Sequence, residues 1–138
     1  MKRILLIGIA ITMFLFKNIS SANYDKIFYD FKIDSITGQV IDFKDYKGKA
    51  ILLVNTASYC GFTKQYNDLQ ELWDIYKSKG LIVLAIPSNS FNQEKSNNED
   101  VKKFCEVNFN INFPIATITD VKGTNSHEIF KWAKNNYG

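Results

Sequence analysis

Two cysteines, Cys60 and Cys105, are the side chains of this 138-residue chain best suited to nucleophilic chemistry. Cys60 follows the apolar run 50–54 and precedes a stretch with helical spacing, so we expect it where a strand leads into a helix N-terminus. Free backbone N–H groups and the positive end of the helix dipole favour a thiolate there, which lowers a cysteine pKa from about 8.5. Since the thiolate is the nucleophile, this position predicts an activated Cys60, and an inert buried cysteine is the alternative interpretation.

The residues after Cys60 exclude a dithiol exchange motif. Such a motif would read Cys-x-x-Cys, whereas this chain has Cys60-Gly61-Phe62-Thr63. Thr63 lies one helical turn further on, and we expect its hydroxyl to donate a hydrogen bond to the sulfur. Two cysteines are also the number that one structural disulfide requires. The residues by themselves therefore leave a structural disulfide and a reaction centre both open.

A second polar cluster, residues 87–94, follows the apolar run 81–86. It includes Gln93, whose amide can hydrogen-bond a thiolate or the oxygen atoms of a ligand without adding charge. The carboxyl ends of parallel strands lie at one edge of a sheet, where ligands gather. We therefore expect this cluster to lie beside Cys60, and an ordinary solvated loop is the alternative.

The elements that position these residues follow from the apolar pattern. Alternation over 29–34 and a turn before 39–41 predict an N-terminal β-hairpin. The runs 50–54 and 81–86 enclose helical spacing that ends at Gly80, which predicts a strand–helix–strand unit with parallel strands. Continuous apolar runs are typical of strands covered on both faces. The predicted fold class is therefore α/β.

The remaining elements surround the second cysteine. Ser96-x-x-Glu99 is a capping box at the start of a helix, and Val101, Phe104 and Cys105 share its apolar face. This face predicts that Cys105 points into the core. We also expect a strand over 113–118 and a last helix over 126–136.

The first 22 residues have the pattern of a secretory signal peptide. A basic start at 1–3 precedes the uncharged run 4–16, and the small residues 20–22 fit a cleavage site after Ala22. A membrane anchor is the alternative, but a spanning helix requires about 20 apolar residues. We therefore expect an exported protein, periplasmic or secreted, with a single mature domain over 23–138.

The mature domain is predicted to be neutral. Removing Lys2, Arg3 and Lys17 lowers the 17 basic residues to 14, which equals the 14 acidic ones. A neutral domain without a basic stripe gives no reason to expect nucleic-acid binding.

Several motifs in register resemble the glutathione peroxidase family. Residues 54–63 with Tyr66 and Leu69 are similar to the active-site signature of the family, and residues 84–94 resemble its second signature. Further matches follow in the same order: Phe104-Cys105, Phe113-Pro114, Asp120-Val121-Lys122-Gly123 and His127-Glu128-Ile129-Phe130-Lys131-Trp132. The resemblance covers 26–138.

This resemblance implies a thioredoxin-like fold and a thiol peroxidase that reduces hydrogen peroxide or organic hydroperoxides in oxidative-stress defence. By motif match Cys60 is the nucleophile, Gln93 assists it, and Cys105 is the resolving cysteine. The implied reductant is a thioredoxin-like protein or glutathione. No metal or organic cofactor is implied, and the lone His127 is not expected to be a ligand.

The chain also departs from the family pattern. A single Asn92 stands where the family has Gly-x before the Gln-Glu pair, and the catalytic Trp-Asn pair of the family has no match before Gly138. We therefore expect a C-terminally truncated domain that lacks the last strands and helix of the family. Two other functions stay open, a peroxide-sensing redox carrier and a non-enzymatic secreted domain with a structural Cys60–Cys105 disulfide.

Overall fold

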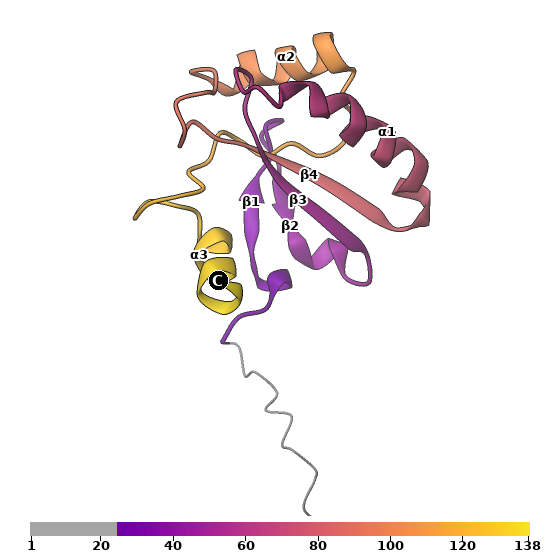
Figure 1. The fold of residues 1–138 in the computed structure, drawn as a ribbon. Coiled ribbons are helices and arrows are strands. Elements are labelled where there is room, and N and C mark those ends of the chain that lie inside the picture. The colour runs from indigo at the N-terminus through magenta and orange to yellow at the C-terminus, as the bar shows by residue number, and fades with distance from the viewer. Residues whose placement is uncertain (1–24) are drawn as a thin grey trace, which may run out of the picture.

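The computed structural model describes residues 25–138 (Figure 1). The predicted signal peptide, 1–22, lies outside the described residues. Within them, no helix has the length and apolar character that a membrane span requires. The helices and strands are α1 Tyr66–Tyr76, α2 Asn98–Phe109, α3 Glu128–Tyr137, β1 Lys32–Asp34, β2 Val40–Asp42, β3 Ala50–Thr56 and β4 Leu81–Pro87, with 3-10 turns η1 Phe28–Asp30, η2 Phe43–Tyr46, η3 Thr63–Gln65 and η4 Lys77–Lys79.

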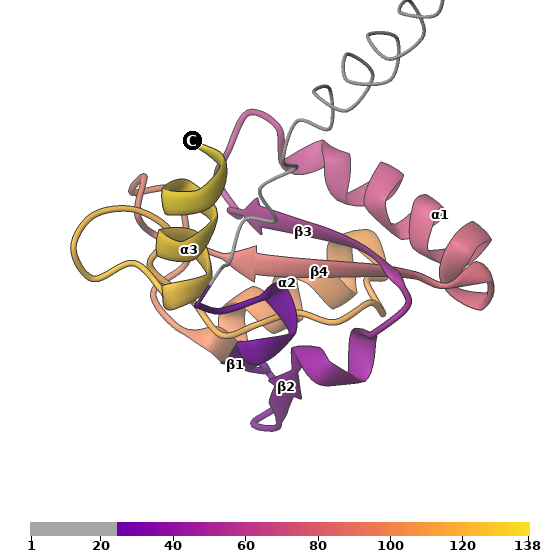
Figure 2. The same ribbon diagram turned by 90° about the horizontal axis from the view of Figure 1, so that it is seen from below.

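The predicted strand–helix–strand unit is present. β3 and β4 pair in parallel from Ala50↔Leu81 to Thr56↔Pro87, and Figure 2 shows them side by side with their arrowheads pointing the same way. Gly80 ends the helical segment between them with a left-handed φ of 94°, which glycine adopts without steric cost.

The two strands differ in burial, although the sequence predicts that both are covered on both faces. β4 is buried from Ile82 to Pro87, as predicted, whereas residues 51–54 of β3 are only partly buried. Within the described residues, β3 has a strand partner on one edge alone, because the sheet it forms contains only β4. The prediction of full cover is therefore wrong for β3.

The N-terminal hairpin is confirmed, with β1 and β2 antiparallel from Lys32↔Asp42 to Asp34↔Val40. The strand predicted over 113–118 is replaced by two single bridges, Ala85↔Ile115 and Ser35↔Ala116. Pro114 has no N–H to donate to a ladder, which limits pairing on this segment. The two bridges nevertheless connect the hairpin to the free edge of β4.

Alternate residues of β4 enter two separate cores, as expected for a strand with helices on both faces. Figure 1 shows α1 and α2 on one side of β3 and β4, and α3 with the hairpin on the other. Val83 and Ala85 pack with α1 and α2, whereas Leu84 and Ile86 pack with the hairpin and with Ile129 of α3. This α/β arrangement places the carboxyl ends of both central strands at one edge.

Helix α2 begins one residue later than the sequence predicts. Asn97, not Ser96, caps it: the Asn97 side-chain oxygen accepts the Asp100 N–H at 2.9 Å, and its amide donates to the Asp100 carboxylate at 2.8 Å. The longer Asn side chain carries its acceptor and its donor on separate atoms, so one residue reaches both the Asp100 N–H and the Asp100 carboxylate. The predicted inward face is confirmed, since Val101 and Cys105 have no exposed area.

Asn97→Ala is expected to lower the free energy of unfolding by about 1 kcal/mol, the usual contribution of a helix N-cap. Urea unfolding monitored by circular dichroism measures it. Ser96→Ala is the matched control and should change stability by less than about 0.5 kcal/mol. Equal losses in the two variants would contradict Asn97 as the cap.

Candidate active site

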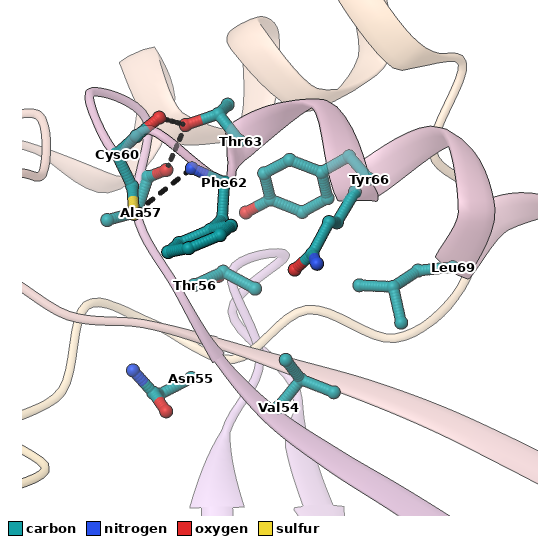
Figure 3. Close-up of a pocket in the computed structure, with 10 residues that line it drawn as sticks. Val54, Asn55, Thr56, Ala57, Cys60, Phe62, Thr63, Tyr66 and Leu69 are labelled. Atoms are coloured by element: carbon teal, nitrogen blue, oxygen red, sulfur yellow. Dashed lines mark hydrogen bonds between the residues drawn. The ribbon is translucent and has the colours of Figure 1, made fainter.

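Cys60 lies in the turn that connects β3 to η3 and α1, as the sequence predicts (Figure 3). It is a free thiol, partly exposed, on the wall of a cavity of about 70 Å³. The cavity lies between the end of β3 and the start of α1, and Thr56, Tyr66 and Leu69 are among its lining residues. A small oxidant therefore reaches the sulfur from solvent without passing through the core.

The sulfur accepts a backbone hydrogen bond rather than the predicted one from Thr63. The Phe62 N–H donates to Cys60 Sγ at 3.5 Å. The Thr63 hydroxyl instead lies 2.6 Å from the Cys60 carbonyl oxygen and 3.0 Å from the Ala57 carbonyl oxygen. The turn brings both carbonyl oxygens within hydrogen-bond distance of the Thr63 hydroxyl, which donates its single proton to one of them. Thr63 stabilises the turn and does not contact the sulfur through a hydrogen bond.

The loop after β4 lies beside the Cys60 loop, which confirms their predicted proximity. The Tyr59 N–H donates to the Gln93 carbonyl oxygen at 2.9 Å. The Gln93 side chain is exposed and makes no hydrogen bond within residues 25–138. The Gln93 backbone therefore lies at the site. The hydrogen bond predicted from the Gln93 side-chain amide to the thiolate or to peroxide stays a prediction.

Glu94 is a functional candidate that sequence reasoning did not single out. Its carboxylate is buried, and Oε1 accepts the Ser58 N–H at 3.1 Å. Glutamate is usually exposed, so the Gln-Glu pair in the sequence gives no sign that this side chain turns inward. Only the path of the two loops reveals it.

Cys105 is a free thiol buried in the core on α2, with Val83, Ala85 and Val101 in the same cluster. It does not line the Cys60 cavity. Burial raises the pKa of the Cys105 thiol to about 11. The structure therefore contains no Cys60–Cys105 disulfide, and while α2 is folded Cys105 is a buried thiol away from the Cys60 cavity.

The raised pKa of Cys105 predicts a loss of stability in alkali. Above pH 9 the unfolded chain releases the Cys105 proton, while the folded protein keeps it up to a pKa of about 11. The unfolded state then binds fewer protons, so the free energy of unfolding should fall between pH 9 and 11, by up to about 2–3 kcal/mol. Urea unfolding across this range measures the fall.

Cys105→Ala is the control for this pH dependence. It removes the titrating thiol, so its stability should decline less steeply over the same range, although a cavity lowers its stability at every pH. Parallel declines in the two proteins would contradict a buried, protonated Cys105.

Comparison with known proteins assigns the chain to a protein family. The model of the glutathione peroxidase family matches residues 28–134, which include both cysteines and the loop after β4. The chain belongs to the glutathione peroxidase family. It is 43% identical over 109 residues to the glutathione peroxidase-like peroxiredoxin GPX5 of Chlamydomonas reinhardtii, with 78% of this chain and 67% of the relative covered. It is 44% identical over 103 residues to the glutathione peroxidase homolog BsaA of Bacillus subtilis, with 74% and 64% covered.

Solved glutathione peroxidases have the same fold. The structure of T. cruzi GPX1 superimposes with a TM-score of 0.62 and 30% identity, over 81% of this chain and 67% of that one. A secreted disulfide oxidoreductase of Mycobacterium tuberculosis, homologous to DsbE, superimposes with a TM-score of 0.53 at 17% identity and shows a shared fold alone. These neighbours confirm the thioredoxin-like fold. The chain spans about two thirds of the length of the relatives it matches.

Proposed function

We propose that the chain is a thiol peroxidase that reduces hydrogen peroxide or organic hydroperoxides through Cys60. The observation that carries this proposal is a free, partly exposed thiol at the β3–α1 junction, within the region matched by the glutathione peroxidase family. The Cys60 thiolate attacks the terminal peroxide oxygen, and the O–O bond breaks. The leaving oxygen takes a proton and departs as water or an alcohol, while the sulfur is oxidised to a sulfenic acid.

Return of the Cys60 sulfenic acid to a thiol requires a second thiol. We propose that Cys105 condenses with the sulfenic acid, so that a disulfide forms and the sulfenic oxygen leaves as water. An external dithiol then reduces this disulfide. Relatives whose names include "peroxiredoxin", from Chlamydomonas reinhardtii and Saccharomyces cerevisiae, support a protein dithiol of the thioredoxin type as reductant.

A steady-state assay tests the function and the reductant together. Peroxide consumption by the full chain is measured with a thioredoxin–thioredoxin reductase system and, separately, with glutathione and glutathione reductase. We expect turnover with both hydrogen peroxide and cumene hydroperoxide, and a higher kcat/KM with thioredoxin. Faster turnover with glutathione would contradict the proposed reductant, and a single slow oxidation without turnover would favour a peroxide sensor.

We also propose that the protein is exported. The charged start, the uncharged run 4–16 and the small residues before position 23 support a cleaved signal peptide. N-terminal sequencing of the mature protein should begin at Asn23. A chain that keeps Met1 would contradict cleavage.

A further inference from the structure

Lys95 lies against two aromatic rings that come from different parts of the chain. Its Nζ is 4.7 Å from the centre of the Tyr59 ring and 5.0 Å from the centre of the Phe104 ring. The same Nζ donates a hydrogen bond to the Tyr59 hydroxyl at 3.0 Å. The other lysines found over aromatic rings within residues 25–138 each contact a single ring. Lys95 therefore bridges two segments.

The two rings belong to the neighbours of the two cysteines. Tyr59 directly precedes Cys60 in the turn between β3 and η3 (the Cys60 turn, residues 57–62), and Phe104 directly precedes Cys105 on α2. A cation is attracted to the electron-rich face of an aromatic ring. One ammonium group thus stabilises the arrangement in which α2 lies beside the Cys60 turn.

The segment that carries this lysine is fixed to the Cys60 turn. The Tyr59 N–H donates to the Gln93 carbonyl oxygen at 2.9 Å. The Ser58 N–H donates to Oε1 of the buried Glu94 side chain at 3.1 Å, and the same oxygen accepts the lysine's own backbone N–H at 2.8 Å. The backbone of the lysine is therefore anchored to the turn, whereas its side chain extends to α2.

No carboxylate takes the place of the rings beside the Lys95 ammonium. None of the ion pairs found in the described part of the chain includes Lys95. The Asp100 carboxylate accepts the Asn97 amide instead. Holding a lysine side chain in one conformation costs rotamer entropy, and Lys95 is partly buried. The contacts with the two rings and the Tyr59 hydroxyl offset that cost.

A second aromatic contact holds the end of α2. The Phe109 ring centre lies 5.6 Å from that of Phe104 and 5.3 Å from that of Tyr66, which lines the cavity of the candidate site. These rings do not depend on a charge. The Lys95–Phe104 contact is therefore the part of the α2 anchorage that a change of charge removes by itself.

We infer that Lys95 is a positioning residue that couples the Cys60 turn to α2 and sets how readily α2 opens to release Cys105. Opening of α2 takes the Phe104 ring away from the ammonium, so the contact stabilises only the closed helix. Loss of the charge should raise the fraction of open α2. The inference rests on the proposed function only in that Cys105 is assigned a reaction there. The effect on α2 itself belongs to the reduced protein.

Lys95→Met and Lys95→Arg test the role of the charge. Methionine keeps an apolar stem and removes the charge and the donor, whereas arginine keeps both and also stacks on aromatic rings. Lys103→Met is the matched control, because Lys103 is exposed on α2 and belongs to none of the ring contacts found within residues 25–138.

The full chain carries Cys60→Ser in each of these proteins, so that N-ethylmaleimide labels Cys105 alone. The alkylation rate is measured on folded, reduced protein without peroxide. It follows the fraction of open α2 when closing is faster than labelling. Amide hydrogen exchange in α2 and at the buried Val83 and Leu84 of β4 is measured on the same samples.

We expect Lys95→Met to raise the alkylation rate of Cys105 about fivefold, as the loss of one partly buried cation–π contact predicts. Lys95→Arg and Lys103→Met should stay within about twofold of the parent rate. Amide exchange should accelerate in α2 but not in β4, where it reports global unfolding. An unchanged rate in Lys95→Met, an equal increase in Lys103→Met or no recovery in Lys95→Arg would overturn the inference. Equal acceleration in α2 and β4 would also overturn it, since it indicates general destabilisation.

Phe104→Leu tests whether the lysine acts through this ring. In that background Lys95→Met should add less than about twofold to the alkylation rate, because the contact is already lost. A full fivefold addition would show that Lys95 acts elsewhere. In chains that keep Cys60, the bridge to Cys105 should form faster in Lys95→Met after one equivalent of peroxide. Faster alkylation without any bridge would contradict the proposed resolving role and leave the effect of Lys95 on α2 established.

Discussion

Cys60→Ser is expected to reduce peroxide consumption at least about a thousandfold, to the level of the uncatalysed reaction. A serine hydroxyl is not ionised near neutral pH, so it supplies no nucleophile for the O–O bond. The side chain is partly exposed and the replacement is nearly isosteric, so the fold should persist. Peroxide consumption with the thioredoxin system measures the effect, and circular dichroism checks the fold.

Cys105→Ser provides the control for that experiment. It should still consume one equivalent of peroxide, because Cys60 is unchanged. Appreciable turnover by Cys60→Ser would show that another group carries the chemistry, and the proposed mechanism would be wrong.

Cys105→Ser should lose steady-state turnover with thioredoxin by about a hundredfold or more. An internal thiol acts at an effective concentration that an external thiol cannot match. Without Cys105, the sulfenic acid reacts only with an external thiol, in a slower bimolecular step. Dimedone labelling followed by mass spectrometry should trap sulfenic acid at Cys60 in this variant. Equal turnover in the variant and the parent protein would remove Cys105 from the mechanism.

The parent protein should form the Cys60–Cys105 disulfide only after α2 opens. A disulfide requires Cα atoms within about 7 Å, and Cys105 is buried in the core and absent from the Cys60 cavity. Mass spectrometry after one equivalent of peroxide should find the bridge. Asn97→Ala weakens the start of α2 and should accelerate its formation. A stable sulfenic acid beside a free Cys105 would instead favour direct reduction by a small thiol.

Local patterns in the sequence predicted most of the elements. The hairpin, the β3–α1–β4 unit and the inward face of α2 follow from apolar periodicity and turn residues, because each depends on side chains close together in the chain. The position of Cys60 between β3 and α1 follows for the same reason. The topology of parallel strands also predicted that the loop containing Gln93 lies beside Cys60.

Other features depended on the path of the chain in space. The Thr63 hydroxyl bonds backbone carbonyls because the turn places them closer than the sulfur, and Asn97 caps α2 because its side chain reaches the Asp100 N–H. The partial exposure of β3 follows from having one neighbouring strand in the described residues. The Thr63 and Asn97 bonds join residues three positions apart, but local spacing offers more than one partner or cap, and the backbone conformation selects among them.

The sequence by itself thus predicted which residue attacks and determined which elements hold it, since motif and periodicity are local properties. The tertiary structure alone decided which side chains surround Cys60. It opens a cavity beside the Cys60 sulfur, and it turns the buried Glu94 carboxylate toward the Ser58 N–H of the cysteine loop. The Glu94–Ser58 contact joins segments more than 30 residues apart, so it exists only after the two loops have come together.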